Sequence, residues 1–152
     1  MQTTGNMVAM SAPETPTPQP WHQLPGAPAG GTVVGALHSF SENAASMVTL
    51  PAAVGVAEES GGFKLLVLRT GPEVHAFANR CAHFGVPLAA KPAQLISTPL
   101  KSLTCNVHYA RYRWADGACE AGECDGEALI AVPLVVRPDG IVCIGQPQGA
   151  GL

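Results

Sequence analysis

Two short Cys/His pairs constrain this chain more than any other feature of its sequence. Residues 81–83 read Cys-Ala-His and residues 105–108 read Cys-Asn-Val-His, with 21 residues between the two pairs. Thiolate and imidazole groups are metal ligands, and two pairs on two loops can close a metal site. Chance placement is the weaker interpretation of two such pairs so close together. The four side chains are therefore candidate ligands of one metal centre.

The order of the ligands separates two kinds of metal centre. Structural zinc sites usually pair Cys with Cys and His with His. Here each pair mixes one Cys with one His. In a two-iron, two-sulfur centre of the Rieske type, two Cys bind one iron and two His bind the other, so each loop can supply one ligand to each iron. The mixed order favours this centre, and a zinc-stabilised β module without redox activity is the alternative.

The segments around both pairs resemble the Rieske ferredoxin family, whose signature is C-x-H…C-x-x-H. The resemblance covers roughly residues 60–145, and its main segments are NRCAHFGVPLA (79–89), CNVHYARYRWADGAC (105–119) and LIAVPLVVRPDGIVCIG (129–145). It implies an all-β fold, an antiparallel β sandwich with an inserted cluster-binding subdomain. It also implies one [2Fe-2S] cluster per chain.

The same resemblance implies roles for individual residues. Cys81 and Cys105 would bind one iron, and His83 and His108 would bind the other. High-potential relatives have a Tyr four residues after the second His that bonds a ligand sulfur, and Tyr112 stands at this position. Two neighbours depart from the family pattern. Tyr109 replaces a usual glycine, and Ala110 replaces the hydroxyl residue of the high-potential relatives.

Outside the motif, the sequence predicts strands and tight turns. FKLLVLRT (63–70) and VHAFANR (74–80) are strand-like runs joined by Gly-Pro-Glu, which is typical of a hairpin. ALIAVPLVV (128–136) and IVCIG (141–145) flank Arg-Pro-Asp-Gly, which predicts a second hairpin. Pro133 cannot donate to a ladder, so its strand is expected at a sheet edge or at a bulge.

The composition divides the chain into two parts. Residues 1–30 are rich in Pro and Thr and bury too little apolar surface to offset the entropy of ordering, so we expect a disordered tail. Trp21 is the exception, because a large aromatic side chain is typical of a packing anchor. Residues 31–148 are the expected iron-sulfur domain, with cluster-binding loops at about 80–126.

The charges are unevenly distributed. Residues 1–63 contain no Lys or Arg, whereas residues 64–113 contain seven of the eight. The net charge of −3 gives no electrostatic footprint for nucleic acid. The basic block surrounds the motif, where it suits the docking of another protein.

The sequence also predicts a location. The first cation is Lys64, so the start of the chain lacks the positive region of a secretory signal. No run approaches the ~18 apolar residues of a membrane span. We therefore expect a cytoplasmic protein without membrane association. Because thiols in that compartment usually stay reduced, Cys119, Cys124 and Cys143 are expected to be small buried apolar residues.

The resemblance implies a function in electron transfer. We expect a one-electron carrier, either a ferredoxin component or a small electron-transfer subunit, between a reductase and an oxygenase or another oxidoreductase. A ring-hydroxylating oxygenase also needs an iron site of two His and one carboxylate. The 44 residues after His108 contain no His, so a self-contained oxygenase is not expected. Whether the chain is itself catalytic stays open at this point.

Overall fold

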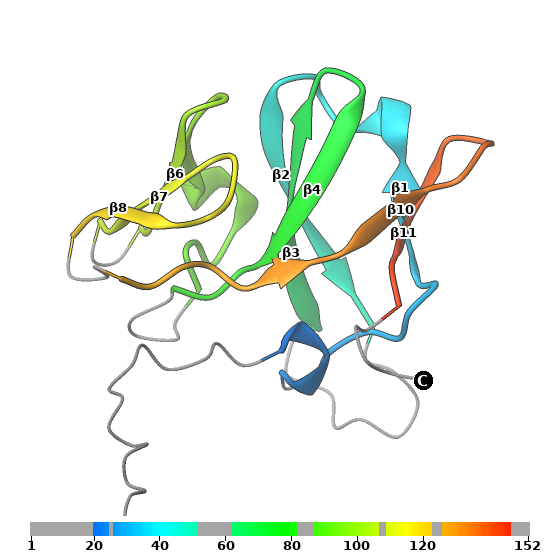
Figure 1. The fold of residues 1–152 in the computed structure, drawn as a ribbon, viewed down its shortest axis with the longest axis horizontal. Helices are drawn as coiled ribbons and strands as arrows, with labels where there is room; N and C mark the ends of the chain where they lie inside the picture. Colours follow the sequence, from blue (N-terminus) through cyan, green and yellow to red (C-terminus); the bar gives the residue numbers. More distant parts are fainter. Residues whose placement is uncertain are drawn as a thin grey trace, which may run out of the picture.

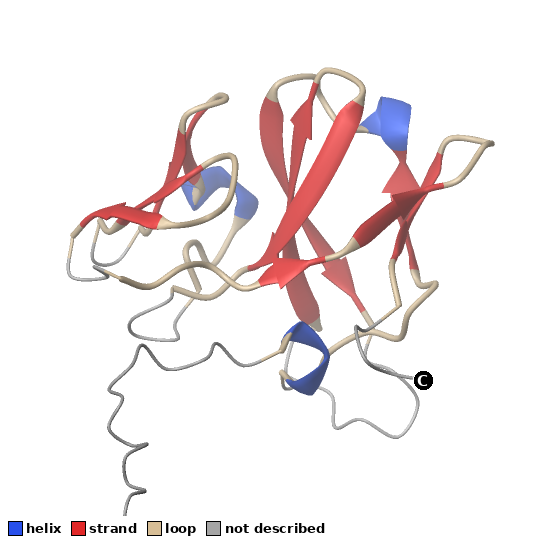
Figure 2. Ribbon diagram, in the orientation of Figure 1, coloured by secondary structure: helices blue, strands red, loops and turns tan. Residues whose placement is uncertain are grey.

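The protein consists of strands and turns in the part of the chain that its structure describes. This computed structural model describes residues 20–24, 26–51, 62–81, 87–106, 109–122 and 126–146. These residues form eleven strands, three short 3-10 turns and no α-helix (Figure 1, Figure 2). No helix in these ranges has the length and apolar character needed to cross a membrane.

The strands form three antiparallel sheets. The first sheet contains β1 (Val33–Ala36), β11 (Ile141–Ile144) and β10 (Leu134–Val136), in this spatial order. The second contains β2 (Ala44–Leu50), β3 (Phe63–Thr70), β4 (Glu73–Ala78) and β9 (Ala131–Val132). The third contains β5 (Ile96–Thr98), β6 (Ser102–Thr104), β7 (Arg111–Arg113) and β8 (Cys119–Ala121). The 3-10 turns are η2 (Trp21–Gln23), η3 (Leu37–Ser39) and η4 (Pro92–Gln94).

Strand β3 is buried on both faces, and this explains its continuous apolar run. Successive side chains of a strand point to opposite faces of the sheet. Leu65 and Val67 lie in a core with the first sheet, whereas Leu66 and Leu68 lie in a core with the third sheet. All four are 0% exposed. The second sheet is therefore the middle of three layers, between β1, β10 and β11 on one side and β6 to β8 on the other (Figure 1).

The two cores are named here by the layers that form them. The sandwich core contains Trp21, Leu24, Ala27, Val34, Phe40, Leu50, Phe63, Leu65, Val67, Ala76, Ala78, Val132, Val142 and Ile144. The insertion core contains Leu66, Leu68, Phe77, Cys81, Leu88, Leu103, Cys105, Ala110, Tyr112, Trp114 and Leu129. Both candidate cysteine ligands thus belong to the insertion core.

The third sheet is inserted between β4 and β9 at a narrow neck. Strands β4 and β9 pair through Ala76 with Val132 and through Phe77 with Ala131. The amide of Ala78 then donates to the carbonyl of Ile130 at 2.9 Å. The chain therefore leaves the sandwich and returns to it at the same place. This arrangement confirms the all-β sandwich with an inserted subdomain.

Both predicted hairpins are present. Strands β3 and β4 pair from Leu65 with Ala78 to Thr70 with Glu73. The second turn ends at Gly140, whose φ of 87° favours glycine. Pro133 lies between β9 and β10, which are edge strands of different sheets. The predicted edge position of Pro133 is confirmed, and the chain changes sheets at this residue.

The sandwich core extends into the segment that was expected to be a disordered tail. Trp21, Leu24 and Ala27 are only 6%, 4% and 1% exposed. The expectation of disorder therefore does not hold for Leu24 and Ala27, which belong to the sandwich core. Trp21 is buried in the same core, as expected of a packing anchor. Residues 1–19 lie outside the described residues.

The burial of Trp21 gives a first prediction. Replacing Trp21 with Ala removes a large buried side chain and should lower the free energy of unfolding by about 3–5 kcal/mol. Urea unfolding followed by circular dichroism measures this loss. The control is Val33→Ala, at a residue that is 55% exposed, which should cost less than about 0.5 kcal/mol. Equal losses in the two variants would show that Trp21 does not support the core.

Candidate metal centre

The two predicted cysteine ligands lie at the ends of strands that face one core. Cys81 lies shortly after β4 and Cys105 directly after β6. They are 1% and 0% exposed, and neither forms a disulfide. His83 and His108 lie outside the described residues. The structure therefore brings the two thiols to the same core and leaves the two imidazoles undescribed.

Asn79 clamps the two ends of the segment that contains Cys81. Its Nδ2 donates to the carbonyl of Ala89 at 2.9 Å, and the amide of Leu88 donates to its Oδ1 at 2.8 Å. Asn79 is only 5% exposed, so these bonds satisfy a buried amide. Sequence reasoning missed this role, although a polar residue at the end of an apolar strand is a signal for it.

The second segment is closed by its own backbone. The amide of Cys105 donates to the carbonyl of Ala110 at 2.8 Å, and the amide of Tyr109 donates to the carbonyl of Cys105 at 2.9 Å. The amide of Asn106 donates to the carbonyl of Leu88 at 2.7 Å. This last bond joins the second segment to the first. The two cysteines are therefore held by linked backbone rather than by separate loops.

A third segment packs against the second at a glycine. Gly122 has a φ of 105°, and a Cβ at this residue would lie 2.9 Å from the Cα of Ala110. A side chain there would collide with backbone, so only glycine permits this close approach. This glycine lies near the end of the expected cluster-binding loops at about 80–126, and the next residues, 123–125, lie outside the described residues.

Tyr112 places a hydroxyl on one of the candidate ligand sulfurs. Its Oη lies 3.1 Å from Sγ of Cys81, and Tyr112 is 0% exposed. The ring is held in β7, where Tyr112 pairs with Leu103 on one side and with Cys119 on the other. A thiolate has no proton to donate, so against a metal-bound sulfur the hydroxyl is the donor. Tyr112 thus lies where the sequence comparison expected a sulfur-bonding tyrosine.

Ion pairs on the exposed face of the third sheet tie its strands together. Nε of Arg111 lies 2.7 Å from a carboxylate oxygen of Glu120, so β7 is joined to β8. The hydrogen bond from Arg113 lowers the pKa of Asp116 to about 2. Both pairs are exposed, so each stabilises the fold little. A carboxylate near the cluster opposes reduction, and the pairing of Glu120 with Arg111 offsets that charge.

Cys119 differs from its prediction. It was expected to be a small buried apolar residue with a reduced thiol, but it is disulfide-bonded. It is half-buried in β8, directly across from Tyr112. Cys143 is buried and not disulfide-bonded, as expected, and Cys124 lies outside the described residues. Cys119 and Cys124 both lie in the expected cluster-binding loops at about 80–126, whereas Cys143 does not, and this position was the signal that set Cys119 apart.

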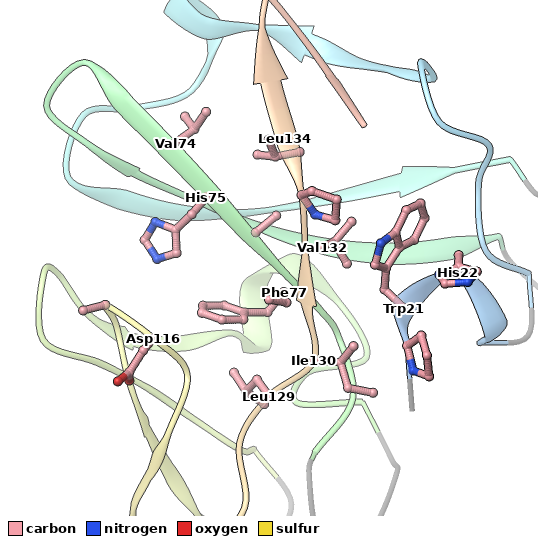
Figure 3. Close-up of a pocket in the computed structure, with 15 residues that line it drawn as sticks. Trp21, His22, Val74, His75, Phe77, Asp116, Leu129, Ile130, Val132 and Leu134 are labelled. Carbon is pink, nitrogen blue, oxygen red and sulfur yellow. The ribbon is translucent and has the colours of Figure 1, made fainter. Parts of the chain in front are cut away.

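A separate hollow of about 910 Å³ lies along β4 and residues 129–134. Figure 3 shows Trp21 and His22 on one side of this hollow and His75 and Asp116 on the other. His75 Nε2 contacts the carbonyl of Trp114 at 2.6 Å, which ties the insertion to the β3–β4 hairpin. The residues that line this hollow include none of the candidate ligands. Within the described ranges, no cluster of three or more His, Cys, Asp or Glu side chains is arranged to hold a metal ion.

The donor set fits the thiolate half of a [2Fe-2S] cluster. Two thiols are buried in one apolar core, and a buried hydroxyl is directed at one of them. Buried thiols that lie in linked segments can become thiolates when a metal replaces their protons. The residues present are therefore compatible with such a cluster.

The Asn79 clamp can be tested by its effect on stability. Asn79→Ala leaves the amide of Leu88 and the carbonyl of Ala89 buried without these partners, which should cost about 2–3 kcal/mol. Asn106→Ala is the control, because its side chain makes one exposed bond of 3.3 Å and should cost less than about 0.5 kcal/mol. Thermal and urea unfolding compare the two variants. A similar small loss in both would contradict the clamp.

Comparison with known proteins identifies the family. The family model of the Rieske [2Fe-2S] domain matches residues 41–135. No curated protein sequence matches the chain. The ferredoxin of carbazole 1,9a-dioxygenase from Nocardioides aromaticivorans IC177 is similar in fold, with 19% identity and a TM-score of 0.56 over 78% of this chain and 99% of that one.

Two further solved structures are similar. The Sphingomonas yanoikuyae B1 ferredoxin has 21% identity and a TM-score of 0.54, over 77% of this chain and 99% of that chain. The terminal oxygenase of carbazole 1,9a-dioxygenase from Novosphingobium sp. KA1 has 25% identity and a TM-score of 0.56, over 78% of this chain but only 31% of that one. The family match spans more than half of the chain and includes both Cys/His pairs. The chain therefore belongs to the Rieske [2Fe-2S] domain family, and its cofactor is a Rieske [2Fe-2S] cluster.

Proposed function

We propose that the protein is a one-electron carrier whose cluster is held by Cys81 and Cys105 on one iron and by His83 and His108 on the other. When bound, the cluster supplies a group that takes up and releases one electron. The contact between Tyr112 Oη and Cys81 Sγ carries the proposal, because it directs a hydrogen-bond donor at a sulfur ligand. Such a donor stabilises the negative charge that a sulfur ligand gains on reduction.

The residues around the thiols set how readily an electron is accepted. Reduction increases the negative charge on the sulfur ligands, and a hydrogen bond to the charged form stabilises it. Tyr112 therefore raises the reduction potential. Ala110 provides no second hydroxyl at the position where high-potential relatives have one. We expect a reduction potential between the two extremes of the Rieske range, which runs from about −150 to +300 mV.

The partners proposed are a reductase that donates the electron and an oxygenase that accepts it. One chain of the solved oxygenase–ferredoxin complexes of carbazole 1,9a-dioxygenase is similar in fold at 22% identity, over 79% of this chain and 30% of that chain. The full-length coverage of two ferredoxins, rather than of an oxygenase, supports a separate carrier.

We also propose that the protein works in the cytoplasm. Cys143, which is not a candidate ligand, has a free thiol, and this suits a reducing compartment. The disulfide at Cys119 is unusual there. Cell fractionation with an antibody to the protein tests the location directly.

Metal content tests the proposed function. Protein purified without oxygen should contain about two irons and two acid-labile sulfides per chain, and the dithionite-reduced form should give the EPR spectrum of a His-ligated cluster with a low average g. Cys105→Ser should lose the cluster. Cys143→Ser removes a buried thiol of the first sheet and should retain it. About one zinc per chain, no sulfide and no EPR signal would instead support the zinc-stabilised β module.

The hydrogen bond of Tyr112 predicts a shift in potential. Tyr112→Phe removes a bond of roughly 1 kcal/mol, which lowers the one-electron midpoint potential by about 40–60 mV. Tyr109→Phe is the matched control, because Tyr109 is 67% exposed and its hydroxyl lies outside the core. Redox titration followed by EPR measures both midpoints. An unchanged midpoint in Tyr112→Phe would remove the proposed role of this hydroxyl.

A further inference from the structure

We propose that Trp114 is a positioning residue for the metal centre. Its contacts with the tip of the β3–β4 hairpin hold the hydroxyl of Tyr112 on the sulfur of Cys81, and through that bond they raise the reduction potential. The inference rests on the proposed function, because it assumes that Cys81 binds the cluster. It adds residues that lie at the opposite end of β7 from Cys105.

The bond between Tyr112 and Cys81 joins two layers of the fold. Tyr112 lies in β7 of the third sheet, whereas Cys81 follows β4 of the second sheet. The distance of 3.1 Å between Oη and Sγ therefore depends on where the third sheet lies over the second. Apolar burial has no direction, whereas a hydrogen bond favours a narrow range of distances and angles. A hydrogen bond between the two layers therefore restricts this distance more than apolar contact does.

One face of the β3–β4 hairpin is directed at the third sheet, and it changes from apolar to polar toward the tip. Leu66 pairs with Phe77, and both lie in the insertion core. Leu68, in the same core, pairs with His75. Because alternate residues of a strand share a face, Thr70 lies on this face two residues after Leu68. The tip of the hairpin therefore presents an imidazole and a hydroxyl to the third sheet.

Trp114 forms hydrogen bonds with both of these groups. Its Nε1 donates to Oγ1 of Thr70 at 2.9 Å. Nε2 of His75 lies 2.6 Å from its carbonyl oxygen. A carbonyl only accepts hydrogen bonds, so Nε2 of His75 is the donor. Trp114 is 3% exposed, so the two bonds supply its indole N–H and its carbonyl with partners that water does not provide.

Trp114 is also fixed to the strand that contains Tyr112. Its amide donates to the carbonyl of Lys101 at 2.9 Å, which extends the pairing of β6 with β7 by one residue. Tyr112 lies two residues earlier, and both aromatic side chains belong to the insertion core. At the other end of β7, the carbonyl of Ala110 accepts a bond from the amide of Cys105 at 2.8 Å. Strand β7 is therefore held at both ends, with Tyr112 between the two attachments.

Loss of the contacts at the hairpin tip would release one end of β7. The hydroxyl of Tyr112 could then move relative to the sulfur of Cys81, and a hydrogen bond weakens as its distance and angle depart from the preferred values. A weaker bond stabilises less of the negative charge that the sulfur gains on reduction. The reduction potential should therefore fall, by less than in Tyr112→Phe, which removes the bond completely.

The experiment removes one contact at the hairpin tip at a time. Thr70→Val keeps the shape of the side chain and removes the acceptor of the indole N–H. His75→Phe keeps an aromatic ring and removes the donor to the carbonyl, whereas His75→Gln retains a side-chain N–H. Thr49→Val is the matched control, because Thr49 pairs with Lys64 at the opposite end of the second sheet.

Redox titration of the holoprotein measures the effect. In Thr70→Val and His75→Phe, the equilibrium constant for reduction should fall about threefold, or about 30 mV where about 59 mV is tenfold. Thr49→Val and His75→Gln should change it less than about 1.3-fold. In a Tyr112→Phe background, Thr70→Val should also change it less than about 1.3-fold, because the bond through which it acts is already absent.

Pulsed EPR of the reduced protein in deuterated buffer gives a second readout. The coupling of the cluster to the exchangeable hydroxyl deuteron of Tyr112 is identified by its loss in Tyr112→Phe. This coupling should weaken in Thr70→Val and stay unchanged in Thr49→Val, because it falls with distance.

Two outcomes would overturn the inference. Thr70→Val could keep the midpoint potential of the wild type while its Tm falls, which would make Trp114 a support of the fold only. The shift could also persist in the Tyr112→Phe background, which would show that it does not act through the hydroxyl. Failure of the proposed function looks different, because the wild type would then contain no iron and sulfide and would have no midpoint to measure.

Discussion

The fold depends on one strand that contributes to two cores. Strand β3 directs Leu65 and Val67 into the sandwich core and Leu66 and Leu68 into the insertion core. Burial of four large side chains on two faces stabilises both layers through a single strand. The position of the candidate ligands follows from this arrangement, because Cys81 lies close after β4, the hydrogen-bonded neighbour of β3. A change in β3 would therefore affect the sandwich and the metal centre together.

Much of the fold could be predicted from the sequence, because its strongest signals are local. The two hairpins have long apolar runs and Gly/Pro turns, and Pro133 marks the break between β9 and β10. The three-residue strands β5 to β8 were not predicted, because so short a strand shows no period and forms only when its neighbours pair with it. The order of Leu24 and Ala27 was not predicted for a similar reason. Their segment is Pro-rich, and it is ordered by a core that distant strands supply.

The types of ligand in the candidate site could be predicted, because the order of the Cys and His residues favours one kind of metal centre over another. Tyr112 could be named only by resemblance, and its position depends on the register of β7 with β6. The Asn79 clamp and the close approach of Gly122 to Ala110 depend on contacts between segments that the sequence does not encode locally. The disulfide at Cys119 was missed because the expected compartment argued against it.

The single neck between β4 and β9 has a consequence for how the protein matures. The sandwich core contains none of the residues of the insertion, so the sandwich can close before the insertion is complete. During that interval Leu66, Leu68 and Phe77 face water, and an open apolar face of this kind promotes aggregation. The insertion core that would cover this face also contains both candidate cysteine ligands, so the side chains that protect the chain from aggregation and those that hold the cofactor belong to one packing unit.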